Sequence, residues 1–182
     1  MSNPVVGILG GGQLGSMLSI AAKKLGIRTI IYCEDKDGPA QYFANEYMVG
    51  DYKNEKKLSE FADKVDLITY EFENIPFDTL KFLNNKKKVL PDPKINKIIQ
   101  NRLSEKDFLN KCDIRTTNYA YIKNDSDLDS NLNLIPGILK TCTMGYDGKG
   151  QIKISNKEEI ENLKIDFNNE DILEKIINLK KE

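Results

Sequence analysis

A glycine-rich turn between an apolar run and a helical segment near the N-terminus constrains the fold of this chain most strongly. Residues 5–9 form a short apolar run, and the next six residues, GGGQLG at 10–15, match the pattern G-x-G-x-x-G. Four apolar residues then fall on one helical face: Leu14, Leu18, Ala21 and Leu25. Gly26 ends this helix, and residues 28–33 read as the next strand. The pattern predicts a strand–helix–strand unit whose helix N-terminus favours an anion.

The ligand of this turn has three interpretations on the local pattern. Glu34 follows Gly15 by 19 residues, the spacing of a dinucleotide-binding fingerprint, which would make this an NAD(P)-binding oxidoreductase domain. The turn can also be a tight strand-to-helix connection without a ligand, or it can bind a phosphate that does not belong to NAD. All three interpretations predict the same α/β fold.

Further alternation of strand and helix patterns extends this unit to residue 93. Strands are expected at 46–50, 66–72 and 88–90, and helices at 58–65 and 76–83, before Pro91-Asp92-Pro93 ends the pattern. Ligands of open parallel sheets collect at the carboxyl ends of the strands, so Glu71 and Glu73 are expected beside the first glycine turn. A solvated strand end is the alternative for these two carboxylates. Residues 1–93 are therefore predicted to form a Rossmann-like domain with a parallel sheet.

The pattern changes after residue 93. Residues 94–115 are predicted to be a linking helix, amphipathic over 95–112, that carries Arg102. Short strands are then expected at 118–122, 135–141, 151–155 and 171–175, with helices at 125–131 and 156–163. Asn156 and Glu159 have the spacing of a capping pair. This order predicts a small α+β subdomain over residues 116–182.

A second glycine-rich segment lies between two of these strands. It begins at Lys140, contains Gly145, Gly148 and Gly150, and ends at Gln151. Backbone N–H groups of a glycine turn can close on a phosphate chain, and a lysine on the preceding strand supplies a point charge. The segment therefore predicts a nucleotide-phosphate site.

Composition excludes several classes of function. The chain has no histidine, so a Ser-His-Asp triad, a histidine base and a histidine-ligated zinc are ruled out within it. Its formal net charge of −1 and its lack of a long apolar run give no reason to expect nucleic acid or a membrane as partner. Three scattered cysteines and no signal-peptide pattern favour reduced thiols in the cytoplasm.

Five motifs follow one another along the chain and together indicate a family. They are GGGQLG at 10–15, YEFENIP at 70–76, NRLSEK at 101–106, LKTCTMGYDGKGQ at 139–151 and ILEKIINLKKE at 172–182. In order and spacing they resemble 5-(carboxyamino)imidazole ribonucleotide synthase, the ATPase subunit of bacterial phosphoribosylaminoimidazole carboxylase, in the ATP-grasp superfamily. The resemblance implies a Rossmann-like parallel-sheet pre-ATP-grasp domain and then a small α+β ATP-grasp lid subdomain, with the C-terminal ATP-grasp half missing.

The resemblance also implies an activity, that of an ATP-dependent carbon–nitrogen ligase of purine biosynthesis. In this family ATP phosphorylates bicarbonate to carboxyphosphate, and the amine of 5-aminoimidazole ribonucleotide then captures the carboxyl group. ATP and Mg²⁺ are the implied cofactors, with the Mg²⁺ ligands expected in the missing half and none in this chain. A homodimer and a complementing C-terminal fragment are the implied protein partners.

Site residues follow from the same resemblance, position by position. For ATP it implies Arg102, Lys140, Gly145, Tyr146, Asp147, Gly148, Lys149, Gly150, Gln151, the hinge residues Glu174, Lys175, Ile176 and Ile177, and Glu182 on the ribose. For the substrate ribonucleotide it implies Gly12, Gln13 and Leu14 near the phosphate, and Glu73 and Tyr146 near the aminoimidazole. No residue of this chain is implied to be catalytic.

Three departures from the family pattern suggest an alternative. Cys142 stands where the family has an arginine, and Met144 stands where it has a glycine, and the chain stops at Glu182, about half the family's length. A truncated or split-gene remnant that binds nucleotide weakly without catalysis is therefore the second hypothesis. The NAD(P)-binding oxidoreductase is the third, and it leaves GYDGKGQ unexplained.

Overall fold

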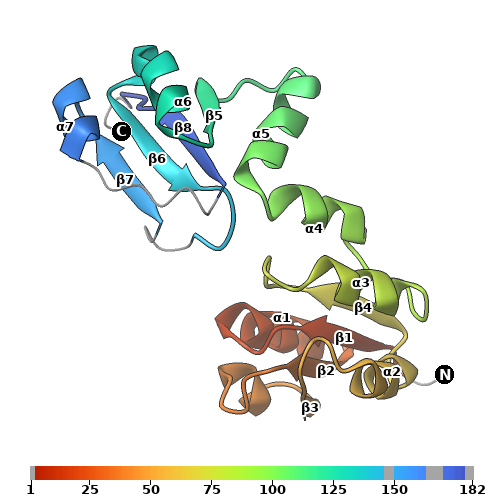
Figure 1. The fold of residues 1–182 in the computed structure, drawn as a ribbon. Helices are drawn as coiled ribbons and strands as arrows, with labels where there is room; N and C mark the ends of the chain where they lie inside the picture. The colour runs from red at the N-terminus through yellow and green to blue at the C-terminus, as the bar shows by residue number, and fades with distance from the viewer. Residues whose placement is uncertain (1–2, 146–149, 163–169, 179–182) are drawn as a thin grey trace. The chain divides into compact units, whose positions relative to one another are not determined.

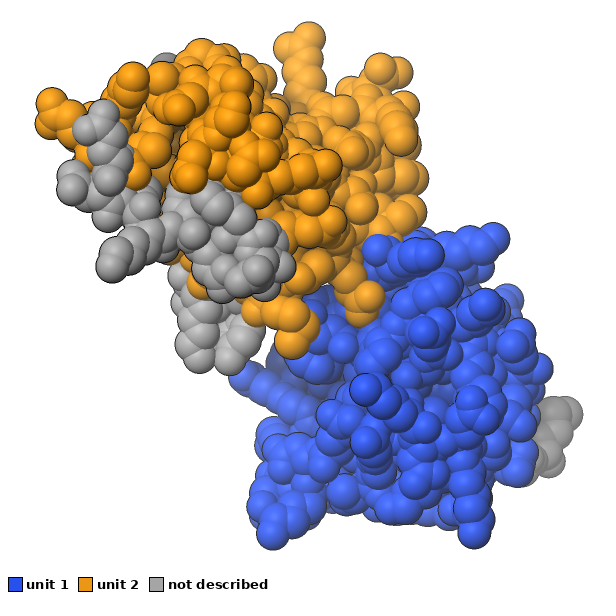
Figure 2. Space-filling view, in the orientation of Figure 1, with its two compact units in different colours: residues 1–97 blue, residues 98–182 orange. Residues whose placement is uncertain are grey.

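The structure of the chain, a computed structural model, describes residues 3–145, 150–162 and 170–178 and contains two sheets in separate units (Figure 1). The units are Met1–Lys97 and Ile98–Glu182 (Figure 2). Within the described ranges, no helix is both long enough and apolar enough to cross a membrane.

The first unit is built on a parallel sheet in the order β3-β2-β1-β4. Its strands are β1 (Val5–Leu9), β2 (Arg28–Cys33), β3 (Glu46–Val49) and β4 (Leu67–Tyr70). Its helices are α1 (Gln13–Lys24), the 3₁₀ turn η1 (Pro39–Tyr42), α2 (Glu55–Asp63), α3 (Phe77–Asn84) and α4 (Pro93–Ile99). The predicted parallel α/β fold is confirmed. The strand expected at 88–90 is reduced to one bridge, between Val89 and Ile68.

The larger core of this unit lies between the sheet and helices α2 and α3. Phe61 of α2 is fully buried, and its ring lies 5.5 Å from that of Tyr32 on β2. Gly7 on β1 makes room for this ring, because an added Cβ there would lie 2.5 Å from the Phe61 Cζ atom. The sheet is therefore held by apolar packing that requires the small residue at the centre of β1.

Helix α1 packs on the sheet through small residues rather than through its apolar face. Gly15, Ser16 and Ser19 are buried, whereas Leu14 is 54% exposed and Leu25 is 76% exposed. An added Cβ on Gly15 would lie 2.6 Å from the Gly10 carbonyl oxygen, so the close approach of helix to strand requires glycine. The helical face seen in the sequence is real, but it points away from the sheet.

The second unit contains an antiparallel sheet in the order β5-β8-β6-β7. Its strands are β5 (Tyr119–Ile122), β6 (Gly137–Thr141), β7 (Gln151–Ile154) and β8 (Asp171–Lys175). Its helices are α5 (Arg102–Lys111), α6 (Asp125–Ser130), the 3₁₀ turn η2 (Leu132–Leu134) and α7 (Lys157–Asn162). The predicted α+β order is confirmed. The capping pair is also confirmed, since the Glu159 N–H donates to Asn156 Oδ1 at 3.0 Å.

One helix prediction is wrong. The single linking helix expected over residues 95–112 is two helices, α4 and α5, separated at Gln100 and Asn101. Asn101 is the reason, because its side chain accepts a hydrogen bond from the Ser104 N–H and begins a new helix there. Arg102 is consequently the first residue of α5, not the middle of a longer helix.

Candidate functional site

The first unit has a crevice at the carboxyl ends of three parallel strands. Its cavity, of about 310 Å³, is lined by Gly10, Gly11, Gly12, Cys33, Glu34, Asp35, Tyr52, Glu71 and Phe72. Most of these residues lie at or directly after the ends of β1, β2 and β4, and Tyr52 follows β3. The strand order reverses between β1 and β4. Such a reversal is where ligands bind in open α/β sheets.

Glu71 reaches across this crevice to the first glycine turn. Its Oε1 accepts a hydrogen bond from the Gly12 N–H at 3.4 Å. Gly10, at φ +116°, leaves room for it, since an added Cβ would lie 2.7 Å from Glu71 Cδ. Burial raises the pKa of Glu71, and the nearby charge of Glu73 adds to the rise, although the Gly12 N–H opposes it. The expected position of Glu71 beside the glycine turn is confirmed.

The other residues predicted in this crevice have different surroundings. Glu34 also lines it, but its Oε1 accepts from the backbone N–H of Tyr52 at 3.1 Å. Gln13 begins α1 and is exposed, Leu14 is exposed on the outer side of α1, and Glu73 is exposed. Of the residues predicted near the substrate, Gly12 lines the crevice, whereas Gln13, Leu14 and Glu73 are not among its lining residues.

In the second unit, a buried carboxylate joins two lysines from different elements. Glu174 on β8 is 8% exposed. Its Oε2 lies 2.9 Å from the Lys140 Nζ on β6, and its Oε1 lies 3.4 Å from the Lys106 Nζ on α5. In the register of β6 and β8, Glu174 lies opposite Ile138, two residues before Lys140. The side chains of Glu174 and Lys140 are therefore diagonal neighbours on one face of the sheet. No role was predicted for Lys106, although it lies one helical turn after Arg102.

Arg102 holds the backbone where the second glycine segment begins. Its Nη1 donates to the Thr141 carbonyl at 2.7 Å, and its Nη2 donates to the Gly145 carbonyl at 2.6 Å. Its own N–H donates to the Cys142 carbonyl at 2.9 Å. The planar guanidinium therefore bridges two carbonyls that lie four residues apart, a geometry that lysine cannot reproduce.

The described ends of the glycine segment show why glycine is favoured there. Gly150 has φ +68°, and an added Cβ would lie 2.5 Å from Thr141 Oγ1. Met144 also has a positive φ of 59°, a conformation that costs a side-chain-bearing residue about 1–2 kcal/mol. Gln151 begins β7 opposite Lys140. The other loop residues predicted to bind phosphate, Tyr146, Asp147, Gly148 and Lys149, lie outside the described residues.

Cys142 points into the unit and not toward the phosphate site predicted beside it. Its side chain is fully buried. Burial raises the pKa of the thiol to about 11, and a backbone hydrogen bond from Leu103 partly opposes the rise. The side chain at this position therefore adds no charge to the surface beside Lys140.

The predicted hinge begins inside the sheet and continues beyond it. Lys175 ends β8, and the Ile176 N–H donates to the Pro136 carbonyl at 3.1 Å. Ile177 is 60% exposed, so an apolar surface is available directly after the strand. Glu182 lies outside the described residues.

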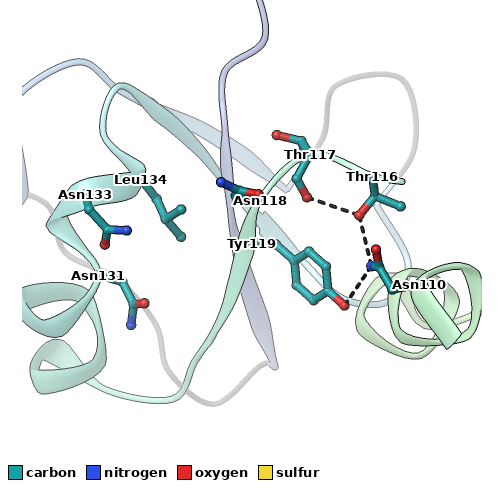
Figure 3. Close-up of a pocket in the computed structure, with 8 residues that line it drawn as sticks. All are labelled: Asn110, Thr116, Thr117, Asn118, Tyr119, Asn131, Asn133 and Leu134. Atoms are coloured by element: carbon teal, nitrogen blue, oxygen red, sulfur yellow. Dashed lines mark hydrogen bonds between the residues drawn. The ribbon is translucent and has the colours of Figure 1, made fainter. Parts of the chain in front are cut away.

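The second unit contains a cavity of about 410 Å³ whose chemistry differs from that of the Lys140 cluster (Figure 3). Figure 3 shows that uncharged polar side chains dominate its lining, and several of them bond one another. The Asn110 Nδ2, for example, donates to Thr116 Oγ1 at 3.1 Å and to the Tyr119 hydroxyl at 3.2 Å. A phosphate chain is better matched by the cationic cluster around Lys140 than by this cavity.

The acidic and thiol side chains of the described residues are dispersed. No three or more of their Cys, Asp or Glu side chains are grouped so that they could hold a metal ion.

Comparisons with known proteins give the same two-part division. Residues 3–100 match the ribonucleotide synthetase preATP-grasp domain family, and residues 107–182 match the ATP-grasp domain family. The first match alone covers more than half of the chain.

Named relatives point to one group of enzymes. The chain is 37% identical over 180 residues to an N5-carboxyaminoimidazole ribonucleotide synthase of Staphylococcus aureus, covering 97% of this chain and 48% of that protein. It is 43% identical over 158 residues to the bifunctional purine synthesis protein purC/E of Dictyostelium discoideum, covering 86% of this chain and 16% of that protein. The crystal structure of N5-carboxyaminoimidazole synthetase from Staphylococcus aureus complexed with ADP superposes with a TM-score of 0.89 at 34% identity, over 97% of this chain and 48% of that one. The chain thus spans about half the length of the Staphylococcus relatives.

Proposed function

This chain belongs to the ribonucleotide synthetase pre-ATP-grasp family, and from this premise we propose that it forms the N-terminal half of an N5-carboxyaminoimidazole ribonucleotide synthase. In the proposed reaction a bicarbonate oxygen attacks the γ-phosphorus of ATP, and ADP leaves. The amine of 5-aminoimidazole ribonucleotide then attacks the carbon of the resulting carboxyphosphate, and inorganic phosphate leaves as the amine loses a proton. The product is 5-(carboxyamino)imidazole ribonucleotide.

The observation that carries the nucleotide half of this proposal is the cationic strand end at Lys140. Lys140 and Arg102 converge there, and the glycine segment starts at the same point. Phosphoryl transfer depends mainly on positioning and charge stabilisation, which cations and loop N–H groups supply. The ADP complex of the Staphylococcus aureus relative supports the same ligand class.

The remaining assignments follow the family pattern. In the second unit, Gly145 to Gln151 would cover the phosphates, the backbone of Glu174 to Ile177 would bind adenine, and Glu182 would bind the ribose. In the first unit, the turn at Gly12, Gln13 and Leu14 would lie near the substrate phosphate, and Glu73 with Tyr146 near the aminoimidazole. Mg²⁺ would neutralise phosphate charge when bound, but the described residues offer no acidic cluster to hold it. The reduced thiols Cys33 and Cys142 suit a cytoplasmic compartment.

Calorimetric titration of the full chain with ADP tests the nucleotide site. We expect wild type to bind, and Lys140→Met to weaken binding about tenfold or more, because a charge-assisted contact to phosphate is lost. Lys157→Met is the matched control, since Lys157 is exposed at the start of α7. Absence of ADP binding by wild type at millimolar concentration would refute the proposal.

A turnover assay separates the enzyme from a binding module. ADP release is measured with bicarbonate, 5-aminoimidazole ribonucleotide and Mg²⁺ present. Release that requires both substrates would show that this chain is sufficient for catalysis. ADP binding without release would favour the second hypothesis, nucleotide binding without catalysis. Solution mass measurement tests the homodimer that the resemblance implies.

A further inference from the structure

Two ammonium groups share one buried carboxylate in the second unit. The side chains of Lys140, Lys106 and Glu174 are only 20%, 16% and 10% exposed, respectively. Among the described residues, two positive charges and one negative charge leave this cluster with a net charge of +1. Removing a charge from water is unfavourable unless an opposite charge compensates it, so this cluster favours the approach of an additional anion.

The position of Lys106 is defined by its neighbours. Its Nζ lies 5.6 Å from the centre of the Tyr119 ring, within the range of a cation–π contact. The Tyr119 hydroxyl in turn donates to Asp107 Oδ1 at 2.7 Å, which fixes the ring against α5. A lysine that is already held in place loses less conformational entropy when it binds a ligand.

Lys106 also lies on the same side of α5 as Arg102. Residues four apart in a helix are neighbours on its surface, so Arg102 and Lys106 form a pair that faces the sheet. Arg102 contacts the carbonyls of Thr141 and Gly145, and Lys106 contacts the carboxylate beside Lys140. Helix α5 thus contributes two cations to the region where the glycine segment starts.

We propose that Lys106 is a further phosphate-binding cation of the nucleotide site, held beside Lys140 by their shared carboxylate on Glu174. This inference rests on the proposed nucleotide-binding function. Because the two ammonium groups flank one carboxylate, a phosphate chain that contacts Lys140 has the second cation within reach. Two separated cations suit a nucleoside diphosphate or triphosphate, whose charge is spread over several phosphates. Glu174 is then a positioning residue for both lysines.

The test uses the full chain and a ligand series in which the phosphate varies. Wild type, Lys106→Met, Lys106→Arg and the control Lys111→Met are titrated calorimetrically with adenosine, ADP and ATP. Lys111 is an exposed lysine at the end of the same helix. We expect Lys106→Met to weaken ADP and ATP binding about tenfold while adenosine binding is unchanged. Lys106→Arg is expected to recover part of the loss because it keeps the charge.

The outcomes separate the inference from the function on which it rests. If wild type does not bind ADP, both are overturned. If wild type binds ADP and Lys106→Met binds it equally well, the inference alone is overturned. An equal loss of adenosine and ADP affinity would show a purely structural role for Lys106 and would also overturn it.

A labelling measurement on wild type avoids any folding defect of the variant. Lysines are reductively methylated with and without saturating ADP, and modification is quantified by mass spectrometry. We expect ADP to protect both Lys106 and Lys140 several-fold and to leave Lys111 unchanged. Protection of Lys140 without protection of Lys106 would overturn the inference.

Discussion

Arg102 provides the sharpest test of how the glycine segment is held. Its guanidinium donates to the carbonyls of Thr141 and Gly145 at 2.7 and 2.6 Å. A hydrogen bond from a charged group contributes about 1.5–3 kcal/mol, and the lower value applies here because Arg102 is partly exposed. Lysine can reach one carbonyl at a time, so Arg102→Lys should cost about 1.5 kcal/mol, and Arg102→Met about 3 kcal/mol.

Native-state hydrogen exchange measures this effect locally. The Thr141 N–H donates to the Gly150 carbonyl at 2.9 Å, a hydrogen bond that joins the two ends of the glycine segment. Since about 1.4 kcal/mol is a factor of ten, we expect the Thr141 amide to exchange about tenfold faster in Arg102→Lys and about a hundredfold faster in Arg102→Met. The Ile31 amide, in the sheet of the first unit, serves as control. Unchanged Thr141 exchange in both variants would show that the guanidinium does not hold the segment.

Three further predictions concern the glycine turn and the thiols. Gly15→Ala should lower the free energy of unfolding by about 1–3 kcal/mol, because the new Cβ would lie 2.6 Å from a carbonyl oxygen; urea denaturation showing equal or greater stability would contradict this. The raised pKa of Glu71 means that its protonated form favours folding, so this stabilisation is complete below its ordinary pKa of 4.5 and is lost as pH rises through the raised value. Glu71→Gln should therefore melt at a higher temperature than wild type near pH 7 and at about the same temperature near pH 4. A difference in melting temperature that stays constant across this pH range would argue against a titrating Glu71. A thiol reagent at about pH 8 should label exposed Cys112 rapidly and Cys142 only after denaturation, since burial raises the pKa of Cys142 to about 11; rapid labelling of native Cys142 would be the contrary result.

The local sequence pattern was sufficient to predict most of the elements. Hydrophobic periodicity and glycine position depend on residues near one another in the chain, and they located the strand–helix–strand unit at residues 5–33 and the antiparallel strands of the second unit. The same local information failed at residues 100–101. There the Asn101 side chain competes with the continuing helix for the Ser104 N–H and ends the single predicted helix.

Side-chain partners were decided by the tertiary structure. Lys140 and Glu174 are 34 residues apart, and they meet because β6 and β8 pair in one particular register. Lys106 joins them only because α5 lies against that face of the sheet. A register is set by the packing of whole strands, so no local pattern around Lys106 could reveal its partner.

The tertiary structure also decided which side chains point into the core of a unit and which point away from it. The apolar stripe of α1 is visible in the sequence, but close packing of Gly15 on the Gly10 carbonyl turns that stripe away from the sheet. Cys142 follows Lys140 by two residues and is nevertheless directed into the unit. The sequence alone determined the order of the elements and the family motifs, because both depend on local residue types and spacing. Which charges meet and which side chains are buried depended on strand pairing and helix packing, which bring together residues distant in the chain.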